Sequence, residues 1–380
     1  MPTPQPTRPH APSAPAFAAP DGLGASAPRK GRGAGSNPTG RFERYQLEID
    51  LEARAEAEAT DGPAPARRTQ YLPDPSRTAL TFNRSPDIPF DASLNPYRGC
   101  EHGCAYCYAR PTHEYLGYSA GLDFETKILV KERAPELLRR ELAAARWVPQ
   151  VVALSGVTDA YQPIERRLEL TRRCIEVFAE FRNPITIVTK NALVVRDIDL
   201  FRPLAADGAI SVSLSLTTLD AALQRSLEPR ASSIQERLRA IEALARAGVP
   251  VGAILGPVIP GLTDHEIPSL LEAAKNAGAG HASYVVLRLP HGLKTLFADW
   301  LATHQPLRRE KVLHRLESLR DGRLNDPRFG SRMKGEGHFA DQIGASFRIW
   351  ARRHGLDRPS PTLSAAAFRR PGGRQLELGL

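Results

Sequence analysis

The chain of 380 residues lacks the features that would place it in a membrane or outside the cell. Its four cysteines are too few for a disulfide scaffold, and clustered thiols in a reducing compartment usually mean metal binding or catalysis. The longest uncharged stretch, around residues 247–262, is short and broken by glycine and proline, so no membrane-spanning helix is predicted. The first 40 residues hold no apolar core of a signal peptide, which favours a cytoplasmic location.

The composition of the chain supports a sizeable folded core. Hydrophobic residues make up 42% of the chain, which excludes a wholly disordered protein. Residues 1–69 are predicted to form a disordered tail, because their first part is rich in proline, alanine and glycine. Residues 359–380 are predicted to form a flexible tail. We expect the folded body between these two tails.

The net charge of +9 is concentrated near the C-terminus. Residues 301–380 hold 16 basic and 8 acidic residues, whereas residues 1–69 hold 9 and 8. A basic C-terminal fifth indicates either a surface for nucleic acid or another anionic partner, or a solvated arginine-rich surface. The sequence leaves both interpretations open.

Short apolar runs alternate with amphipathic stretches over residues 70–290. The runs predict buried parallel strands at 151–154, 185–188, 210–216, 249–255 and 284–289, after a first strand that precedes Cys100. The stretches between them predict helices at 134–147, 164–181, 234–247 and 264–277. About six right-handed βαβ units follow, so the fold class is α/β, a full or partial barrel whose chemistry sits at the carboxyl ends of its strands. Residues 291–358 are predicted to form a helical C-terminal extension.

Three of the four cysteines are clustered in one short stretch. Cys100, Cys104 and Cys107 have the spacing C-x3-C-x2-C on a loop that contains glycine. Soft thiolates select zinc or an iron–sulfur cluster. A zinc site would need a fourth ligand, such as His102 or Cys174. A three-thiolate iron–sulfur cube would instead leave one iron open, and no second cysteine group is present for another cluster.

This spacing, with Tyr106 before the third cysteine, resembles the hallmark of the radical SAM superfamily. Residues 95–110, 154–165 and 187–197 are further similar to its spore photoproduct lyase-related, DNA-repair-photolyase-like group. The resemblance implies a partial (β/α)6 barrel and a [4Fe–4S] cluster on the three cysteines. It also implies that S-adenosylmethionine (SAM) binds the open iron and is cleaved reductively to a 5′-deoxyadenosyl radical. An electron donor such as flavodoxin or ferredoxin is the implied partner.

The resemblance also implies where SAM is bound. Ser155, Gly156, Thr158 and Asp159 follow the second predicted barrel strand, where the superfamily carries a Gly-Gly-Glu-like motif that meets the SAM amino group. That motif is absent here, so backbone acceptors of this stretch are favoured over any one side chain. Asp159 has the alternative role of capping the next helix.

Three further strands contribute predicted SAM contacts, and each contact has a structural alternative. Lys190 would hold a carboxylate, or its stem would lie along the barrel rim with the ammonium in solvent. Ser213 and Ser215 share one strand face and would meet the ribose hydroxyls and the SAM carboxylate, or bond to neighbouring backbone. Gly252 and Ile254 resemble the superfamily's stretch near the adenine.

The leading prediction is a radical SAM enzyme whose substrate is unidentified, with nucleic acid favoured by the basic C-terminus. One alternative is radical SAM modification of a peptide, a protein or a small metabolite. Another is a non-catalytic nucleic-acid-binding protein with a structural metal site. Cys174, within a helical pattern, is predicted to be a buried structural thiol rather than the hydrogen-donating cysteine of spore photoproduct lyase. Residues 325–338 are predicted to form either a phosphate-recognising lid or a surface connection.

Overall fold

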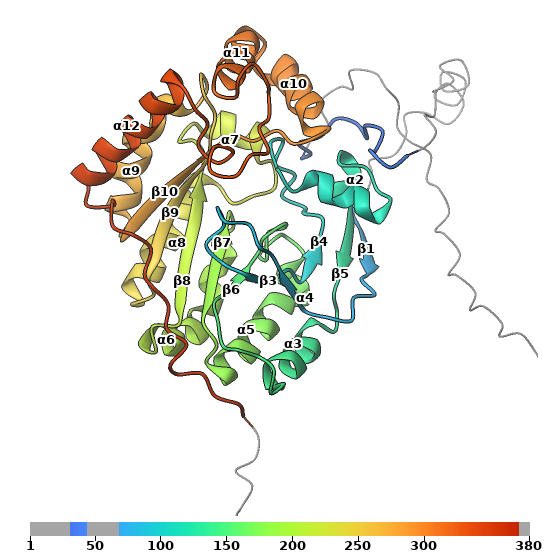
Figure 1. Ribbon diagram of the computed structural model, residues 1–380, viewed down its shortest axis with the longest axis vertical. Coiled ribbons are helices and arrows are strands. Elements are labelled where there is room, and N and C mark those ends of the chain that lie inside the picture. Colours follow the sequence, from blue (N-terminus) through green and yellow to red (C-terminus); the bar gives the residue numbers. More distant parts are fainter. Residues whose placement is uncertain (1–30, 44–67, 372–380) are drawn as a thin grey trace, which may run out of the picture.

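The computed structural model describes residues 31–43 and 68–371 (Figure 1). Its largest sheet has the strand order β10-β9-β8-β7-β6-β3-β2. Six neighbouring strands of this sheet run parallel: β3 (Ala92–Leu94), β6 (Val152–Leu154), β7 (Ile185–Thr189), β8 (Ile210–Leu216), β9 (Val251–Val258) and β10 (His281–Val286). β2 (Leu80–Phe82) pairs antiparallel with β3 at the edge. Six parallel strands in chain order form the expected partial (β/α)6 barrel.

A smaller sheet lies beside the barrel and leads into the cysteine loop. Its order is β1 (Gln70–Pro73), β5 (Lys127–Val130) and β4 (Tyr97–Arg98), with β5 parallel to β1 and antiparallel to β4. The chain leaves β4 directly into the loop that carries the three cysteines. This small sheet therefore fixes where that loop begins.

Helices connect the strands and cover the outer face of the barrel sheet (Figure 1). The α-helices are α2 (Leu122–Thr126), α3 (Ala134–Ala143), α4 (Glu165–Leu168), α5 (Leu170–Phe181), α6 (Ile198–Ala206), α7 (Ala221–Leu227), α8 (Ile234–Arg246), α9 (Ile267–Asn276), α10 (Leu293–His304), α11 (Arg309–Ser318) and α12 (His338–Arg353). Short 3₁₀ turns are η1 (Arg110–Leu116), η2 (Ala192–Asp197), η3 (Asp264–Glu266) and η4 (Pro306–Arg308). No helix among these described segments is long and apolar enough to cross a bilayer.

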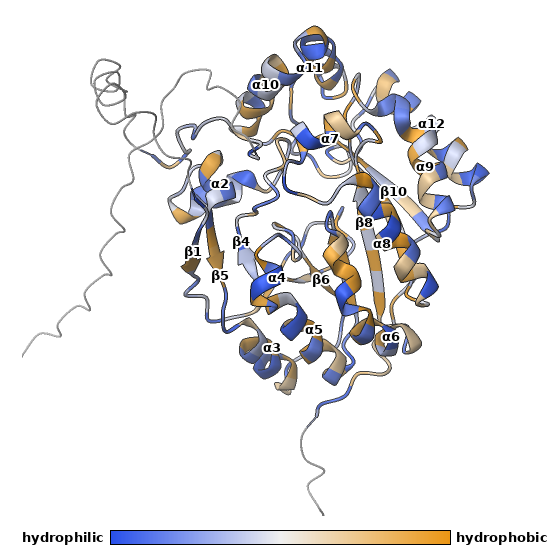
Figure 2. Cartoon of the chain, turned by 180° about the vertical axis from the view of Figure 1, so that it is seen from behind, coloured by the Kyte–Doolittle hydropathy of each residue, from blue (hydrophilic) through white to orange (hydrophobic). Residues whose placement is uncertain are grey.

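The two faces of the barrel strands differ in chemistry. On β8, Val212, Leu214 and Leu216 belong to the main hydrophobic core, and the serines between them point to the other side. Figure 2 shows hydrophobic colour along the strands and hydrophilic colour on the outer surfaces of the helices. The inner face of the barrel is therefore free to carry polar residues for a ligand.

Most of the predicted helices and strands are present in the structure, and the differences lie at the ends or in the middle of a few of them. The helix expected over 164–181 is two helices, α4 and α5, because Glu169 adopts a left-handed φ of 48° between them. The last barrel strand is shifted toward the N-terminus, ending at Val286 rather than residue 289, and its pairing with β9 is irregular near that end. Pro306 does interrupt the C-terminal helical region, between α10 and α11.

Parts of the expected tails are packed against the body. Residues 31–43 lie on the cysteine loop and on α2, as described below. Near the other end, Ser364 N donates to Gly208 O at 2.9 Å and the Phe368 ring lies 6.2 Å from the Phe181 ring, between centroids. The structure thus differs from the expected tails in these two segments. The remaining tail residues, 1–30, 44–67 and 372–380, lie outside the described residues.

Candidate functional site

The cysteine loop lies between β4 and η1. Cys100 and Cys104 are each 7% exposed, Cys107 is partly buried, and all three thiols are free of disulfides. Tight turns fold the loop, since Cys107 N donates to Cys104 O at 3.2 Å. Gly103 has a φ of 66°, and a Cβ there would lie 2.7 Å from Glu125 Oε2. In the chain as described, no group of three or more His, Cys, Asp or Glu side chains is arranged to hold a metal ion.

A buried arginine ties the cysteine loop to α2. Arg110 is fully buried and donates from Nε to Cys104 O at 3.0 Å and from Nη2 to Gly103 O at 3.2 Å. The same guanidinium pairs with Glu125 Oε1 at 2.5 Å, and this carboxylate is also fully buried. Charged hydrogen bonds in a buried setting are strong when every partner is satisfied. Arg110 and Glu125 therefore fix the path of the loop backbone.

Residues 31–43 cover the outer side of this loop. Glu125 accepts from Gly33 N at 3.2 Å and from Ala34 N at 2.8 Å. A Cβ on Gly33 would lie 1.8 Å from Gly103 O, so only glycine permits this approach. Asn37 exchanges hydrogen bonds with the side chain and the backbone of Asp123 on α2. The segment behaves as an N-terminal strap, a name we keep for residues 31–43.

The turn after β6 lies against the other side of the cysteine loop. Asn95 Oδ1 accepts from Gly156 N at 2.9 Å, and Thr158 Oγ1 donates to Gly99 O at 2.7 Å. Tyr108 donates from its hydroxyl to Gly156 O at 2.7 Å. The predicted SAM-binding turn is thus beside the cysteines. Its backbone is oriented by side chains from the loop and from the residue that follows β3.

Ser155 and Asp159 both have internal hydrogen-bond partners. Ser155 adopts a φ of 78°, and its Oγ accepts from Ala160 N at 2.6 Å. Asp159 accepts from Thr189 Oγ1 at 2.7 Å and from Lys190 N at 2.8 Å.

His102 Nδ1 lies 3.4 Å from the Asp159 carboxylate. Burial alone would raise the pKa of Asp159, but His102 and the hydrogen bonds from β7 lower that pKa to about 2. Asp159 also accepts from Tyr161 N at 2.9 Å in a turn that precedes α4, but the N-cap of that helix is Ile164, so the alternative role of Asp159 as a helix cap is wrong. The side chain therefore links β6, β7 and the cysteine loop.

Lys190 and the β8 serines lie on the inner face of the barrel. Lys190 Nζ donates to Ser215 Oγ at 2.8 Å and lies 5.7 Å from the Tyr106 ring centroid. Ser215 Oγ in turn donates to Gly256 O at 2.8 Å on β9. Ser213 precedes Ser215 by two residues, so it lies on the same face of β8, and it is 9% exposed. Lys190, Ser215 and Tyr106 are therefore brought together at the strand ends.

Tyr106 connects the cysteine loop to an ion pair that the sequence analysis did not identify. Its hydroxyl donates to Glu228, and Thr217 Oγ1 donates to the same carboxylate at 2.7 Å. Glu228 pairs with Arg237, and both side chains are fully buried. Arg237 donates to Ser215 O at 2.9 Å. Burial opposes ionisation of Glu228, but Arg237 and Lys190 hold its pKa below the usual range.

Gly252 and Ile254 differ in their positions on β9. Gly252 is the second residue of the strand, and a Cβ there would lie 2.2 Å from His281 Nε2. The structure therefore places Gly252 under the His281 ring and away from the strand ends. Ile254 is partly exposed on the same strand face and pairs in register with Ser215. Gly252 pairs in register with Ser213, so each of the two predicted adenine contacts lies beside one of the β8 serines, with Ile254 nearer the carboxyl end of the strand.

The two predicted candidates for a fourth zinc ligand are engaged elsewhere. His102 Nε2 lies 3.2 Å from Asn191 Nδ2, and its other ring nitrogen faces Asp159. Cys174 is fully buried on α5 within the main hydrophobic core. Burial raises the pKa of the Cys174 thiol well above its usual range. Cys174 is thus buried in packing, as the sequence indicated.

Residues 325–338 lie against the carboxyl end of β10. Val286 N donates to Met333 O at 2.8 Å. Arg332 forms an ion pair with Asp87, which precedes β3. The segment therefore joins the first and the last parallel strands of the barrel at their rim.

Cationic and aromatic side chains meet beside this segment. The Arg288 guanidinium carbon lies 5.7 Å from the centroid of the Tyr108 ring, and Tyr108 is 52% exposed. Arg288 Nε is buried and has no hydrogen-bond partner among residues 31–43 and 68–371. Arg332 lies 4.6 Å from the centroid of the exposed Phe329 ring. These pairs stand next to the cysteine loop.

The structure is a parallel α/β barrel that carries three free thiols on a loop at its strand ends, and this combination is typical of a metal-dependent enzyme. Comparison with known proteins identifies the family of that enzyme. The family model of the Radical SAM superfamily matches residues 94–274. An uncharacterised protein of Mycobacterium tuberculosis is 35% identical over 283 residues, which cover 74% of this chain and 80% of that protein. The chain therefore belongs to the radical SAM superfamily and is an enzyme, which excludes the non-catalytic alternative.

Two further similarities are more distant. The protein named Radical SAM Nalpha-GlyT isomerase of Pseudomonas phage M6 is 28% identical over 188 residues, covering 49% of this chain and 37% of its own. A solved structure of a spore photoproduct lyase mutant has a TM-score of 0.53 at 16% identity, covering 83% of this chain and 85% of that one. Spore photoproduct lyase complexed with dinucleoside spore photoproduct has a TM-score of 0.52 at 17% identity, covering 75% and 79%. At such identities the solved structures establish the fold.

The cofactors of this superfamily are a [4Fe–4S] cluster and SAM. The type and spacing of the donor residues fit the cluster, although among the described residues the thiols are not gathered to ligating positions. The donor set is three free thiols on one loop, which is the chemistry that selects an iron–sulfur cluster. Cys100, Cys104 and Cys107 would hold the cluster. The inner barrel face beside them offers the hydroxyl of Ser215, the ammonium of Lys190 and free strand-end backbone.

The sequence analysis missed the residues that support the loop. Arg110 and Glu125 hold the loop backbone, Glu228 accepts from Tyr106, and Asn95 accepts from Gly156 N in the turn beside the loop. Asn95 and Arg110 lie within the stretch that carried the family resemblance. Charged residues so near the cysteines were a usable signal, because a buried charge requires a partner. Glu228 had no such signal, since its partner Tyr106 lies 122 residues from it in the chain.

Proposed function

We propose that this enzyme cleaves SAM reductively at a [4Fe–4S] cluster on Cys100, Cys104 and Cys107 and abstracts hydrogen from a nucleic acid. When bound, the cluster supplies the electron that splits the SAM sulfonium bond into methionine and a 5′-deoxyadenosyl radical. The observation that carries the substrate class is the Arg288–Tyr108 pair next to Cys107. A cation and an exposed aromatic face beside the reacting centre suit a phosphate and a stacked base.

The chain's own residues would orient SAM. Lys190 and Ser215 suit its carboxylate, because they bring an ammonium and a hydroxyl to the inner face of the barrel. Ser155, Gly156 and Thr158 would present backbone oxygens to its amino group, since the Asp159 carboxylate is used by other partners. Ser213 and Ile254 would complete the site on the ribose and adenine sides, with Gly252 further down the strand.

Two circumstances support a nucleic acid over other substrates. Phe329 adds a second exposed ring at the same rim, stacked on Arg332, whose charge is paired with Asp87. The fold resembles that of a lyase whose solved complex contains a dinucleoside. We further propose an external donor such as flavodoxin or ferredoxin, and a cytoplasmic location, where the four free thiols would stay reduced.

Anaerobic reconstitution followed by two measurements tests the proposal. With dithionite and SAM, the protein should form 5′-deoxyadenosine, and the Cys104→Ala variant should form none. An oligonucleotide should bind with an affinity that falls steeply with salt, and Arg288→Gln should weaken binding by about tenfold or more. Arg246→Gln is the control, because Arg246 pairs with Glu242 on the surface of α8.

The outcomes separate the remaining alternatives. Formation of 5′-deoxyadenosine without oligonucleotide binding would replace nucleic acid by a peptide, a protein or a small metabolite. Equal losses in Arg288→Gln and Arg246→Gln would mean that only net charge matters, and the assignment of the rim would fail. A reconstituted, brown protein that forms no 5′-deoxyadenosine would contradict the reaction itself.

A further inference from the structure

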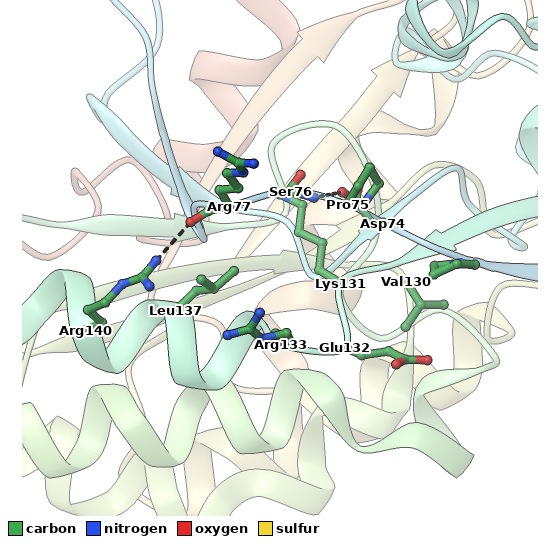
Figure 3. Close-up of a pocket in the computed structure, with 11 residues that line it drawn as sticks. Asp74, Pro75, Ser76, Arg77, Val130, Lys131, Glu132, Arg133, Leu137 and Arg140 are labelled. Atoms are coloured by element: carbon green, nitrogen blue, oxygen red, sulfur yellow. Dashed lines mark hydrogen bonds between the residues drawn. The ribbon is translucent and has the colours of Figure 1, made fainter. Parts of the chain in front are cut away.

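A cavity of about 550 Å³ lies at the carboxyl ends of the parallel strands β1 and β5 (Figure 3). Its lining comes from the stretch that follows β1 and from the loop between β5 and α3. A volume of this size is typical of a small-molecule site. The cavity is separate from the barrel mouth, because it flanks the start of β4, whereas the cysteine loop leaves the end of that strand.

Lys131 is the unusual residue of this cavity. It is 5% exposed, it lines the cavity, and its ammonium has no hydrogen-bond or ion-pair partner within the described part of the chain. Its backbone is fixed, since Lys131 N donates to Pro96 O at 2.9 Å. Burying an ammonium without a partner is costly, and lysines are rarely buried unless paired. Burial accordingly lowers the pKa of Lys131.

Other cations stand around the same cavity. Arg77, Arg133 and Arg140 line it with exposed side chains, and Figure 3 shows Arg140 bonded to the Arg77 carbonyl. The guanidinium of Arg133 has no partner among the described residues. The lining thus holds four cationic side chains.

Acidic residues offset only part of this charge, with Asp74 and Glu141 both acting on the Lys131 ammonium. Asp74 and Glu132 also line the cavity. Asp74 is held by Arg98, with Nε 2.7 Å from Oδ2, and Glu132 is exposed. The cavity therefore keeps a net positive charge with Lys131 inside it.

From this geometry we propose that the cavity binds a phosphate group, supplied either by a free nucleotide or by a nucleic-acid strand. Arginine forks and a point-charged lysine are the side chains that recognise phosphate. The site goes beyond the reaction at the barrel mouth, since none of its residues takes part in the proposed SAM site.

The test uses the full-length, reconstituted protein in calorimetric titrations with inorganic phosphate, AMP and a single-stranded oligonucleotide. We expect the wild type to bind at least one of these probes. Lys131→Met should weaken that binding by tenfold or more, and Arg133→Gln by a smaller factor. Arg139→Gln is the matched control, because Arg139 neighbours Arg140 on α3 but pairs with Glu180 outside the cavity. This control should bind as the wild type does.

Each result bears on the proposal. Binding of AMP or phosphate without the oligonucleotide identifies a free ligand, and the reverse identifies a strand.

Thermal unfolding of the variants shows whether they are folded. Lys131→Met removes an unpartnered buried charge, so its melting temperature should not fall below that of the wild type. If Lys131→Met nevertheless fails to fold, exposed Arg133 provides the test. Absence of binding by the wild type, or equal binding by the wild type, Lys131→Met and Arg133→Gln, would overturn the proposal. Equal binding by the three proteins would leave the predictions for Arg288 untouched, whereas absence of oligonucleotide binding by the wild type would also contradict those predictions.

Discussion

The Glu228–Arg237 pair shows how single residues support the site without touching a cofactor. Both side chains are fully buried, and removing one partner leaves an uncompensated charge. We predict that Glu228→Gln lowers the free energy of unfolding by about 3–5 kcal/mol. Urea unfolding followed by circular dichroism measures this loss. The surface variant Glu242→Gln should change it by less than about 0.5 kcal/mol.

The same pair predicts a pH dependence. The pKa of Glu228 is lower in the folded protein than in the unfolded chain, so its ionisation stabilises the fold. That contribution is fully present above the unfolded pKa and is lost as the pH falls through the folded pKa. Between neutral pH and acid, the stability difference between the wild type and Glu228→Gln should therefore shrink. A difference that stays constant down to the acid transition would show that Glu228 acts without its charge.

Replacing Cys174 distinguishes an iron–sulfur cluster on three cysteines from a zinc site that uses Cys174 as a fourth ligand. We predict that Cys174→Ala still reconstitutes with iron and sulfide to the wild-type absorbance near 400 nm. Its melting temperature should drop, because the substitution opens a small cavity in the core. Cys104→Ala should lose the absorbance. Loss of iron from Cys174→Ala would instead make Cys174 a ligand.

At the scale of elements, the N-terminal strap makes a sharp steric prediction. Gly33→Ala would place a Cβ 1.8 Å from Gly103 O, so the strap has to move off the cysteine loop. The melting temperature should fall by several degrees, and the cluster should bleach faster in air. Gly292→Ala is the control, because its Cβ would meet nothing within 4 Å and its φ is −63°. Matching melting and bleaching rates in the two variants would exclude a covering role for the strap.

The sequence predicted the elements that depend on local patterns. Five barrel strands were recognised because their apolar runs recur between amphipathic helices, whereas the first was placed only by its position before Cys100, since β3 has no β-branched residue. The strap was missed because its composition is that of a disordered tail, and only its contacts with Glu125 and Asp123 order it. The cysteine spacing predicted the cluster loop for the same local reason. The Lys131 cavity was missed because the β1–β5 pairing that creates it joins residues more than 50 positions apart.

At the scale of the whole molecule, residues 364–369 attach the C-terminal stretch to the outside of the barrel. Phe368 packs on the core beside Phe181, and Arg369 N donates to Phe181 O at 2.9 Å. We predict that Phe368→Ala costs about 1–2 kcal/mol of stability, less than a fully buried phenylalanine would. Denaturant titration measures it. Leu307→Ala, at a fully exposed position, should cost nothing measurable.

The residues that contact the cysteine loop are synthesised at different times, so the loop gains its contacts in stages. Ala105 N donates to Leu227 O, and Arg230 reaches back to the His102 carbonyl and the Glu101 carboxylate. A chain synthesised only as far as β6 already contains Arg110 and Glu125, but it lacks Leu227 and Arg230. Its cysteine loop is therefore held on one side only. The other side is complete once the chain has been synthesised past Arg237, which pairs with Glu228.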